Sequence, residues 1–310
     1  MNKNLKAKLE FLRTLLPKML IIGGSGLVGS TLTQYALPNY NIHVIVNENA
    51  IESDRISITK IDLLEKRTAI IKLIQKFRPD VVINTVAHAS VDLCETNPQL
   101  ADLLHIDVTR DIANVCYDIN SKLIHFSTEW VFDGNLDRKY IEEDKPNPIN
   151  HYGKTRLEAE NIVKDTSEQN VVLRTAVVYG WHKRSRFTNW IIQTLKEKRV
   201  VDPFVDQYNT PTLVDDLAKV ILKIIEMHIS GLYHAVGKTC ISRYEFALLL
   251  ADKFGLDRNL VKPVTSQEKK QDAPRPLKSC LSAEKLEKLI GYNFCDIQSG
   301  ISFIFNKSLR

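Results

Sequence analysis

A glycine-rich turn near the N-terminus is the feature that most constrains the fold of this chain. Gly23, Gly26 and Gly29 form a G-x-x-G-x-x-G pattern at the end of an apolar segment that begins at Met19, and an amphipathic segment follows. Glycines permit a tight turn and let the backbone approach a diphosphate, whose charge is met by the first N–H groups of the helix. Three glycines alone are weak evidence, but a strand before them and a helix after them predict a dinucleotide-binding turn.

Apolar strands alternate with amphipathic helices from this turn as far as Gly180. Strands are expected at 41–47, 56–62, 80–87, 121–132 and 170–180, and helices at 65–77, at 98–118 and after His151. This alternation is typical of a parallel sheet covered by helices on both faces. We therefore expect an α/β fold, a Rossmann-type doubly wound parallel sheet with a smaller C-terminal substrate lobe.

The regularity weakens after Gly180. Helices are expected at 186–199, over 210–228, from Ser242 as N-cap and from Ser282, with one strand at 231–236. The predicted domains are an amphipathic basic extension at 1–18, a dinucleotide-binding Rossmann domain at 19–180, and a substrate-binding lobe at 181–310 that is partly interleaved with the sheet.

The formal net charge of +5 is concentrated at the N-terminus. Residues 1–18 contribute +4, from five basic residues and Glu10: Lys3, Lys6, Lys8, Arg13 and Lys18. A solvated basic tail is favoured over a polyanion site, so no nucleic-acid partner is expected. Leucines at helical spacing predict a short helix at 3–16 that caps the fold or joins an oligomer contact, and membrane-surface binding is the less favoured use.

The cysteines and the hydropathy pattern bear on the compartment. The five cysteines form no CxxC pair and no Cys/His spacing suited to zinc, so no metal site is expected. Their odd number and scatter fit buried thiols in a reducing compartment. No apolar run reaches the roughly 18–20 residues that span a bilayer, and charges interrupt the N-terminus. A cytoplasmic protein without membrane contact is expected.

Three side chains in the middle of the chain suit carbonyl reduction. Thr128 ends an expected strand, and Tyr152 and Arg156 lie four residues apart at the start of a helix, so they share one face, whereas Lys154 points nearly opposite. A hydroxyl, a tyrosine and a cation beside a nicotinamide are the parts that such a reaction needs. The cofactor supplies hydride, and the tyrosine protonates the developing alkoxide.

Six segments from about Met19 to about residue 303 resemble, in the same order, the dTDP-4-dehydrorhamnose reductases of the extended short-chain dehydrogenase/reductase superfamily. STEWVFDG (127–134) is similar to their STDYVFDG, and HYGKTRLEAE (151–160) to YGKTKLxGE. NTVAHASVDLCE (84–95) resembles NAAAHTAVDxAE, and LRTAVVYG (173–180) resembles LRTSWVYG. NTPT (209–212) and APRP (273–276) are similar to the family's G-x-P-T and RP segments.

The resemblance implies site residues. Cofactor-binding residues are the glycines with Leu27, Val28, Asp62, Leu63, Val86, Ala87, His88, Phe126, Tyr152 and Arg156. Catalytic residues are Thr128, which holds the substrate carbonyl, Tyr152 as proton donor, and Arg156. Neighbours of a nucleotide-sugar substrate are Val91, Asp92, Thr128, Glu129 and Arg275, the last toward a phosphate. A homodimer is a further expectation.

Structural alternatives exist for four of these residues. Thr128 is also an ordinary β-branched strand residue, although its motif favours the functional role. His88 is as well explained by packing and hydrogen bonding. Asp92 is equally suited to capping the following helix, and Arg275 to a surface ion pair.

Several positions depart from the family pattern, most of them on the substrate side. Arg156 replaces the usual lysine of Tyr-x-x-x-Lys. It keeps a charge that would lower the tyrosine pKa from about 10 toward about 7, but not the geometry of lysine. Asp107 stands at the place of an asparagine that helps a proton relay, and Trp130, Val177 and Ala89 replace a tyrosine, a tryptophan and a threonine. The substrate therefore need not be dTDP-4-dehydrorhamnose.

The cofactor and the activity each retain an alternative. Asn47 at the end of the second strand, with Arg55 beyond it, is compatible with NADPH and does not exclude NADH. NAD(P)H-dependent reduction of a 4-keto group on a nucleotide-linked deoxysugar, in dTDP-rhamnose biosynthesis or a similar route, is the leading hypothesis. Trp130 argues against a dehydratase, while an epimerase stays open. The alternative is a non-catalytic regulatory role, because the chain also resembles the β subunit of methionine adenosyltransferase.

Overall fold

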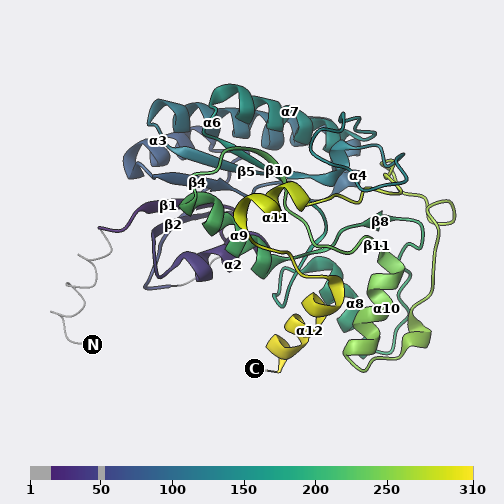
Figure 1. Cartoon of the computed structure of the whole chain (residues 1–310). Helices are drawn as coiled ribbons and strands as arrows, with labels where there is room; N and C mark the ends of the chain where they lie inside the picture. The colour runs from purple at the N-terminus through teal and green to yellow at the C-terminus, as the bar shows by residue number, and fades with distance from the viewer. Residues whose placement is uncertain (1–14, 48–52, 310) are drawn as a thin grey trace.

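The computed structural model describes residues 15–47 and 53–309. In this part of the chain, seven parallel strands form one central sheet (Figure 1). Their order is β10-β6-β5-β4-β1-β2-β3. Their bounds are β1 (Lys18–Ile22), β2 (Asn41–Val46), β3 (Ser57–Lys60), β4 (Val81–Asn84), β5 (Lys122–Thr128), β6 (Val171–Thr175) and β10 (Gly231–His234). The expected Rossmann-type α/β fold is confirmed.

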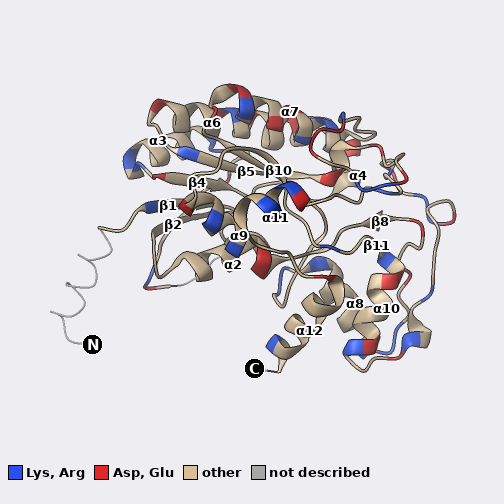
Figure 2. Ribbon diagram, viewed as in Figure 1, with Lys and Arg blue, Asp and Glu red and all other residues tan. Residues whose placement is uncertain are grey.

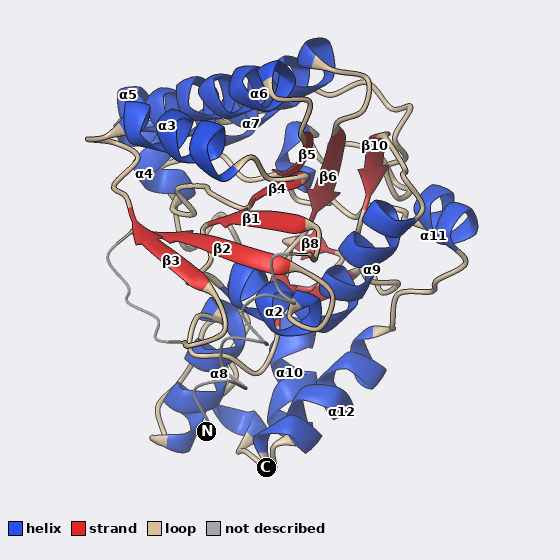
Figure 3. Ribbon diagram, turned by 90° about the vertical axis from the view of Figure 1, so that its left-hand side faces the viewer, coloured by secondary structure: helices blue, strands red, loops and turns tan. Residues whose placement is uncertain are grey.

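Helices cover both faces of this sheet (Figure 3). One face carries α3 (Arg67–Phe77), α6 (Val108–Asp118) and α7 (His151–Thr166), and the other carries α2 (Leu27–Ala36) and α9 (Val214–Glu226). Because side chains alternate along a strand, β1 sends Met19 and Ile21 into one buried cluster and Leu20 and Ile22 into the other. Each fully buried side chain of this size contributes about 1.5–3 kcal/mol. These two cores fix the strand ends that carry the site.

A second group of elements packs beyond the carboxyl edge of the sheet. It contains β7 (Val178–Tyr179), α8 (Arg186–Lys196), β8 (Tyr208–Asn209), β9 (Thr212–Leu213), β11 (Ile241–Ser242), α10 (Arg243–Lys253) and α12 (Ile297–Ser308). A third buried cluster, which includes Tyr179, Ile191 and Phe246, holds these elements together. α9 and β10 come from the same second half of the sequence, yet both join the sheet region formed by the first half. α9 packs on α2, and β10 pairs with β6. The two halves of the chain are thus interleaved in space.

Some expected elements differ in extent from the observed ones. The strand expected over 121–132 ends at Thr128 and continues as a 3-10 turn, Glu129–Val131, while 170–180 divides into β6 and β7. The helix over 98–118 consists of α5 (Pro98–Ala101), a π-helical turn (Asp102–Asp107) and α6. The final helix is two helices, α11 (Glu284–Ile290) and α12, because Gly291 ends the first with φ +59°. Ser242 caps α10 as expected, within a capping box with Glu245.

The expectation of free cysteines is wrong for one pair. Cys240 and Cys280 form a disulfide with a Cα–Cα distance of 5.6 Å, which lies in the usual range. Cys280 lies beside the bridge that joins Tyr140 to Leu281. Forty residues separate the two cysteines, so their spacing gives no hint of the contact. Cys94, Cys116 and Cys295 are free, and the first two are buried.

Two further expectations concern the surface. The amphipathic helix at 3–16 lies outside the described residues, apart from its last two positions. None of the described helices is long and apolar enough to cross a membrane. Basic and acidic residues are interspersed along α7 and α10 (Figure 2).

Candidate dinucleotide and substrate site

The glycine turn between β1 and α2 is sterically restricted. Gly23 has φ +88°, and a Cβ there would lie 2.5 Å from Thr85 Oγ1. A Cβ on Gly29 would lie 2.5 Å from the Gly23 carbonyl oxygen, so the turn closes only with glycine at both positions. Gly26 is the N-cap of α2 and has no side-chain cap. The first N–H groups of the helix are thereby left to an anionic ligand.

A cavity of about 600 Å³ opens along this turn and the carboxyl ends of β2 and β4. Its volume suits a cofactor. Nine of the residues expected to bind the cofactor line it: Gly23, Gly26, Leu27, Val28, Asp62, Leu63, Val86, Ala87 and His88. Gly29 instead packs behind the turn, and Phe126, Tyr152 and Arg156 are not among the lining residues. The donor-rich turn and the size of the groove fit a nicotinamide dinucleotide.

A second cavity, of about 420 Å³, adjoins the first. Ala89 and Arg186 line both cavities. Of the residues expected beside the substrate, Val91, Asp92 and Arg275 line the second cavity, whereas Thr128 and Glu129 do not. Side chains that the sequence did not single out complete the wall, among them Phe187, Trp190, Phe204, Arg243 and Lys269. They come from distant segments and match no motif, so only the fold reveals them.

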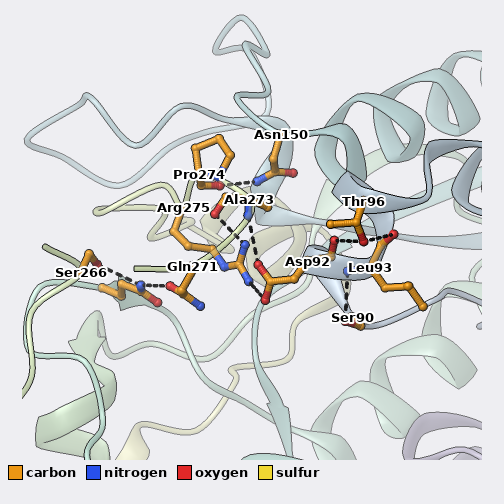
Figure 4. Close-up of polar contacts among 11 residues, drawn as sticks. Ser90, Asp92, Leu93, Thr96, Asn150, Ser266, Gln271, Ala273, Pro274 and Arg275 are labelled. Atoms are coloured by element: carbon orange, nitrogen blue, oxygen red, sulfur yellow. Dashed lines mark hydrogen bonds and ion pairs between the residues drawn. The ribbon is translucent and has the colours of Figure 1, made fainter. Parts of the chain in front are cut away.

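Asp92 and Arg275 hold each other in the wall of the second cavity (Figure 4). Arg275 Nη2 donates to Asp92 Oδ2 at 2.8 Å, and the Ala273 backbone N–H donates to Asp92 Oδ1 at 3.1 Å. The Arg275 side chain is only 8% exposed, and its guanidinium lies 5.1 Å from the Trp130 ring centroid. The N-cap of α4 (Val91–Thr96) is Ser90, not Asp92. Of the structural alternatives, the ion pair is therefore observed and the cap is not.

Tyr152 lies in the first turn of α7, between residues of the two cavities. The ring of Trp130, from the second cavity, packs edge-on at 5.8 Å, and the ring of His105 packs edge-on at 5.5 Å. His105 Nε2 in turn accepts a hydrogen bond from the backbone N–H of His88, a residue of the first cavity. The Asn150 side chain caps the helix by accepting from Gly153 N at 2.8 Å. The start of α7 thus holds the phenol close to both cavities.

Thr128 and Glu129 form a buried polar pair at the end of β5. The Thr128 hydroxyl donates to Glu129 Oε2 at 2.9 Å and accepts from Trp130 N at 3.2 Å. Glu129 is 5% exposed, and burial raises the pKa of its carboxyl to about 7, although Thr128 and Arg243 act against this shift. Such a carboxyl changes its protonation near neutral pH. No motif in the sequence indicated this.

The cation next to Tyr152 does not lower the tyrosine pKa in the way expected from the sequence. Burial raises the pKa of Tyr152 above its usual value. The charge of Arg156 and a hydrogen bond with Thr128 pull the pKa down, while Glu129 raises it further, and burial outweighs the lowering. The expected pKa near 7 for Tyr152 is therefore wrong. That expectation considered only the charge of Arg156, because the sequence does not reveal how deeply the phenol is buried.

Arg156 shares the inner face of α7 with Tyr152, as its spacing predicts, while Lys154 is exposed. Its side chain is buried, and it donates to the carbonyl oxygens of Val86 and Phe126 at the ends of β4 and β5. Burial lowers the pKa of the guanidinium, whereas Tyr152 and Glu160 raise it. Its Nε is buried without a partner among the described residues. The arginine therefore ties the helix to the strand ends that carry the cofactor-lining residues.

Asp107, which stands at the place of the family's asparagine, is engaged by basic side chains of α3 and α6. Its carboxylate pairs with Arg67 and Arg110 at 2.9 and 2.8 Å, with the side chain 38% exposed. The π-helical turn that ends at Asp107 directs His105 inward, where its Nδ1 lies 2.8 Å from Thr155 Oγ1. Burial lowers the pKa of His105 to about 2, so the ring is neutral.

The fold and the glycine-lined groove define a dinucleotide-binding protein of the extended short-chain dehydrogenase/reductase superfamily. The model of the RmlD substrate binding domain matches residues 17–309, and the chain belongs to this family of oxidoreductases.

Individual relatives and a solved structure agree with this assignment. The chain is 28% identical over 298 residues to the dTDP-4-dehydrorhamnose reductase of Aggregatibacter actinomycetemcomitans. The matched residues cover 93% of this chain and 98% of that protein. It is 33% identical over 280 residues to the methionine adenosyltransferase 2 subunit beta of Xenopus laevis, with 88% and 82% covered. The dTDP-4-dehydrorhamnose reductase of Bacillus anthracis, solved with NADP, superposes with a TM-score of 0.82 at 25% identity, over 94% and 100% of the chains. These findings support a nicotinamide cofactor.

Proposed function

We propose that this protein catalyses NAD(P)H-dependent reduction of a 4-keto group on a nucleotide-linked deoxysugar, with the reaction chemistry of the dTDP-4-dehydrorhamnose reductases. The observation that carries the proposal is the place of Tyr152, whose ring contacts Trp130 of one cavity and His105, which accepts a hydrogen bond from the His88 N–H of the other. A phenol at the junction of a dinucleotide groove and a second cavity suits protonation of a carbonyl oxygen during hydride transfer.

Each residue has a defined part in this proposal. A nicotinamide bound in the groove would supply the hydride. Tyr152 gives its proton to the oxygen of the reduced carbonyl, and the raised pKa keeps the phenol protonated until the alkoxide forms. Thr128 holds the carbonyl oxygen once its hydroxyl, which donates to Glu129 in this structure, turns its proton toward the substrate. Arg156 keeps α7 against the ends of β4 and β5, and so keeps Tyr152 beside the groove.

The second cavity suits a nucleotide sugar. Its cations Arg186, Arg243, Lys269 and Arg275 suit a diphosphate, and its aromatic rings suit a base or sugar face. NADPH is the proposed reductant, because Asn47 at the end of β2 lines the groove where an acidic residue would favour NADH. A homodimer remains an expectation from the resemblance.

The test is turnover of 4-keto sugars linked to thymidine or uridine nucleotides. Turnover is measured by the oxidation of NADPH and by isolation of the product. Tyr152→Phe is the matched variant, and we expect kcat to fall about 1000-fold, while the NADPH Kd changes little because the phenol serves the chemistry. Equal activity in this variant would remove Tyr152 as the acid.

A negative result would also be informative. If the wild-type protein binds NADPH, turns over none of these substrates and copurifies with a partner enzyme, the reductase proposal fails. The regulatory alternative would then take its place. We do not favour that alternative now, because both the tyrosine and the threonine of the reaction are retained next to the groove.

A further inference from the structure

The loop between β7 and α8 crosses from the second half of the chain onto the glycine turn. His182 Nε2 lies 3.2 Å from Ser30 Oγ in α2. Ser30 Oγ donates in turn to the Gly26 carbonyl oxygen at 2.6 Å. A short chain of hydrogen bonds thus joins residue 182 to the backbone of the turn that lines the dinucleotide groove.

The direction of this chain of hydrogen bonds follows from its partners. The Arg184 backbone N–H donates to His182 Nδ1 at 3.1 Å, so this ring nitrogen is an acceptor. Burial and the nearby charges of Lys183, Arg184 and Lys307 lower the pKa of His182, which favours the neutral ring. The hydrogen then resides on Nε2, which donates to Ser30 Oγ.

The rest of the loop is held just as firmly. Ser185 is fully buried, and its hydroxyl accepts from Gly180 N at 3.1 Å and lies 2.6 Å from Thr188 Oγ1. Asn189 Nδ2 donates to the His182 carbonyl oxygen at 2.9 Å. The two residues between these anchors, Lys183 and Arg184, therefore have a defined position although their side chains are exposed.

Both side chains line the dinucleotide groove. Lys183 and Arg184 line the first cavity together with Gly23, Gly26 and Leu27. Two cations and a set of free backbone N–H groups thus meet in one groove, and α2 has no acidic residue in its first turn. Their shared complement is a phosphate anion.

We propose that Lys183 and Arg184 form a clamp that binds the diphosphate of the dinucleotide together with the N-terminus of α2. The inference rests on the proposed function only in that a dinucleotide occupies the groove. The diphosphate is favoured over a 2′-phosphate, because the link from His182 to Ser30 and Gly26 holds the loop against the N-terminal turns of α2.

The test compares dinucleotide affinity in the full chain. Lys183→Gln with Arg184→Gln removes both charges, and the matched control Lys72→Gln with Lys76→Gln removes two charges from exposed positions of α3 that line neither cavity. Kd values are measured by cofactor fluorescence for NADPH and NADH. We expect at least a tenfold rise of Kd for both dinucleotides, which is about 1.4 kcal/mol. The affinity should also depend less on ionic strength than in the wild type, and the control should match the wild type.

Each other outcome overturns the clamp. An unchanged Kd in the loop variant removes it, as does an equal loss in the control, which would show a general effect of net charge. A loss confined to NADPH would assign the two cations to the 2′-phosphate instead of the diphosphate. Failure of the reductase proposal is distinguishable, because it appears as absent turnover in the wild type while the difference in dinucleotide Kd persists.

Discussion

The glycine turn at 22–29 and the second cavity around Arg275 are built in different ways. The turn offers backbone N–H groups, and its form depends on the absence of side chains at Gly23 and Gly29. The second cavity offers guanidinium and aromatic groups that come from the 3-10 turn Glu129–Val131, from α8 and α10, and from the segment at 269–275. A backbone site is set by a few consecutive residues, whereas a side-chain site depends on contacts between distant segments.

This difference has a consequence for what each region tolerates. A side chain added in the turn clashes with the backbone, so it should abolish most of the affinity for the cofactor at once instead of lowering it in small steps. Substitution in the second cavity removes one contact among several and should give graded effects on the substrate alone. Matched variants in the two regions can separate these behaviours.

Gly29→Ala should have the largest effect. Its Cβ would lie 2.5 Å from the Gly23 carbonyl oxygen and 2.8 Å from Gly24 Cα, so the turn must open. We expect the NADPH Kd to rise more than about 100-fold, or over roughly 2.7 kcal/mol, by fluorescence titration. Ser25→Ala is the control, since Ser25 lines the same groove and its loss should alter Kd less than about threefold if the backbone holds the phosphates. Equal losses in the two variants would contradict a backbone site.

Glu129→Gln tests the burial of charge beside the second region. Because the pKa of this carboxyl rises from 4.5 to about 7 on folding, the folded state holds more protons than the unfolded state in that window. The contribution of Glu129 to stability is therefore fully present below pH 4.5 and is lost as the pH rises to about 7. Two titratable groups lie near this carboxyl. The charge of Arg243 opposes the rise of the Glu129 pKa, and Glu129 in turn raises the pKa of Tyr152.

The expected result is a difference between two pH profiles of unfolding free energy. The wild type should lose roughly 2 kcal/mol relative to Glu129→Gln between about pH 5.5 and about pH 8, because one pKa unit equals about 1.4 kcal/mol. Urea unfolding followed by circular dichroism measures this. Glu158→Gln, at an exposed position of α7, is the control and should leave the profile unchanged. Parallel profiles for Glu129→Gln and the wild type would show that this carboxyl does not titrate in the window.

The same contrast explains what the sequence could predict. The Rossmann fold, the glycine turn and the residues along β2 and β4 follow from local patterns, because strand ends and helix starts bring them to one edge. Arg243 and Lys183 match no motif, and their places depend on how α8 and α10 pack. The disulfide of Cys240 and Cys280 and the raised pKa of Tyr152 depend on tertiary contact and burial, which no spacing of residues reports.

Arg275→Ala should have an intermediate effect, confined to the substrate. The side chain is mostly buried against Trp130 and paired with Asp92. Its loss should raise the KM for the sugar nucleotide about tenfold while the NADPH Kd stays within about twofold, because Arg275 lines only the second cavity. Lys278→Ala, three residues on and paired with Asp137 at the surface, is the control. A matching rise in the NADPH Kd would show that the two regions are not independent.

Arg156→Lys should have the smallest effect, and it tests how the two regions are joined. The guanidinium is committed to the carbonyl oxygens of Val86 and Phe126, and its charge is spread over three nitrogens. An ammonium concentrates the charge on one atom, so it should lower the Tyr152 pKa further than the arginine does. We expect a rise of kcat of about threefold, or roughly 0.7 kcal/mol, and a shift of the alkaline limb of the pH profile to lower pH. A fall in kcat with unchanged NADPH Kd would mean that anchoring α7 to the strand ends matters more to the chemistry than the field at the phenol.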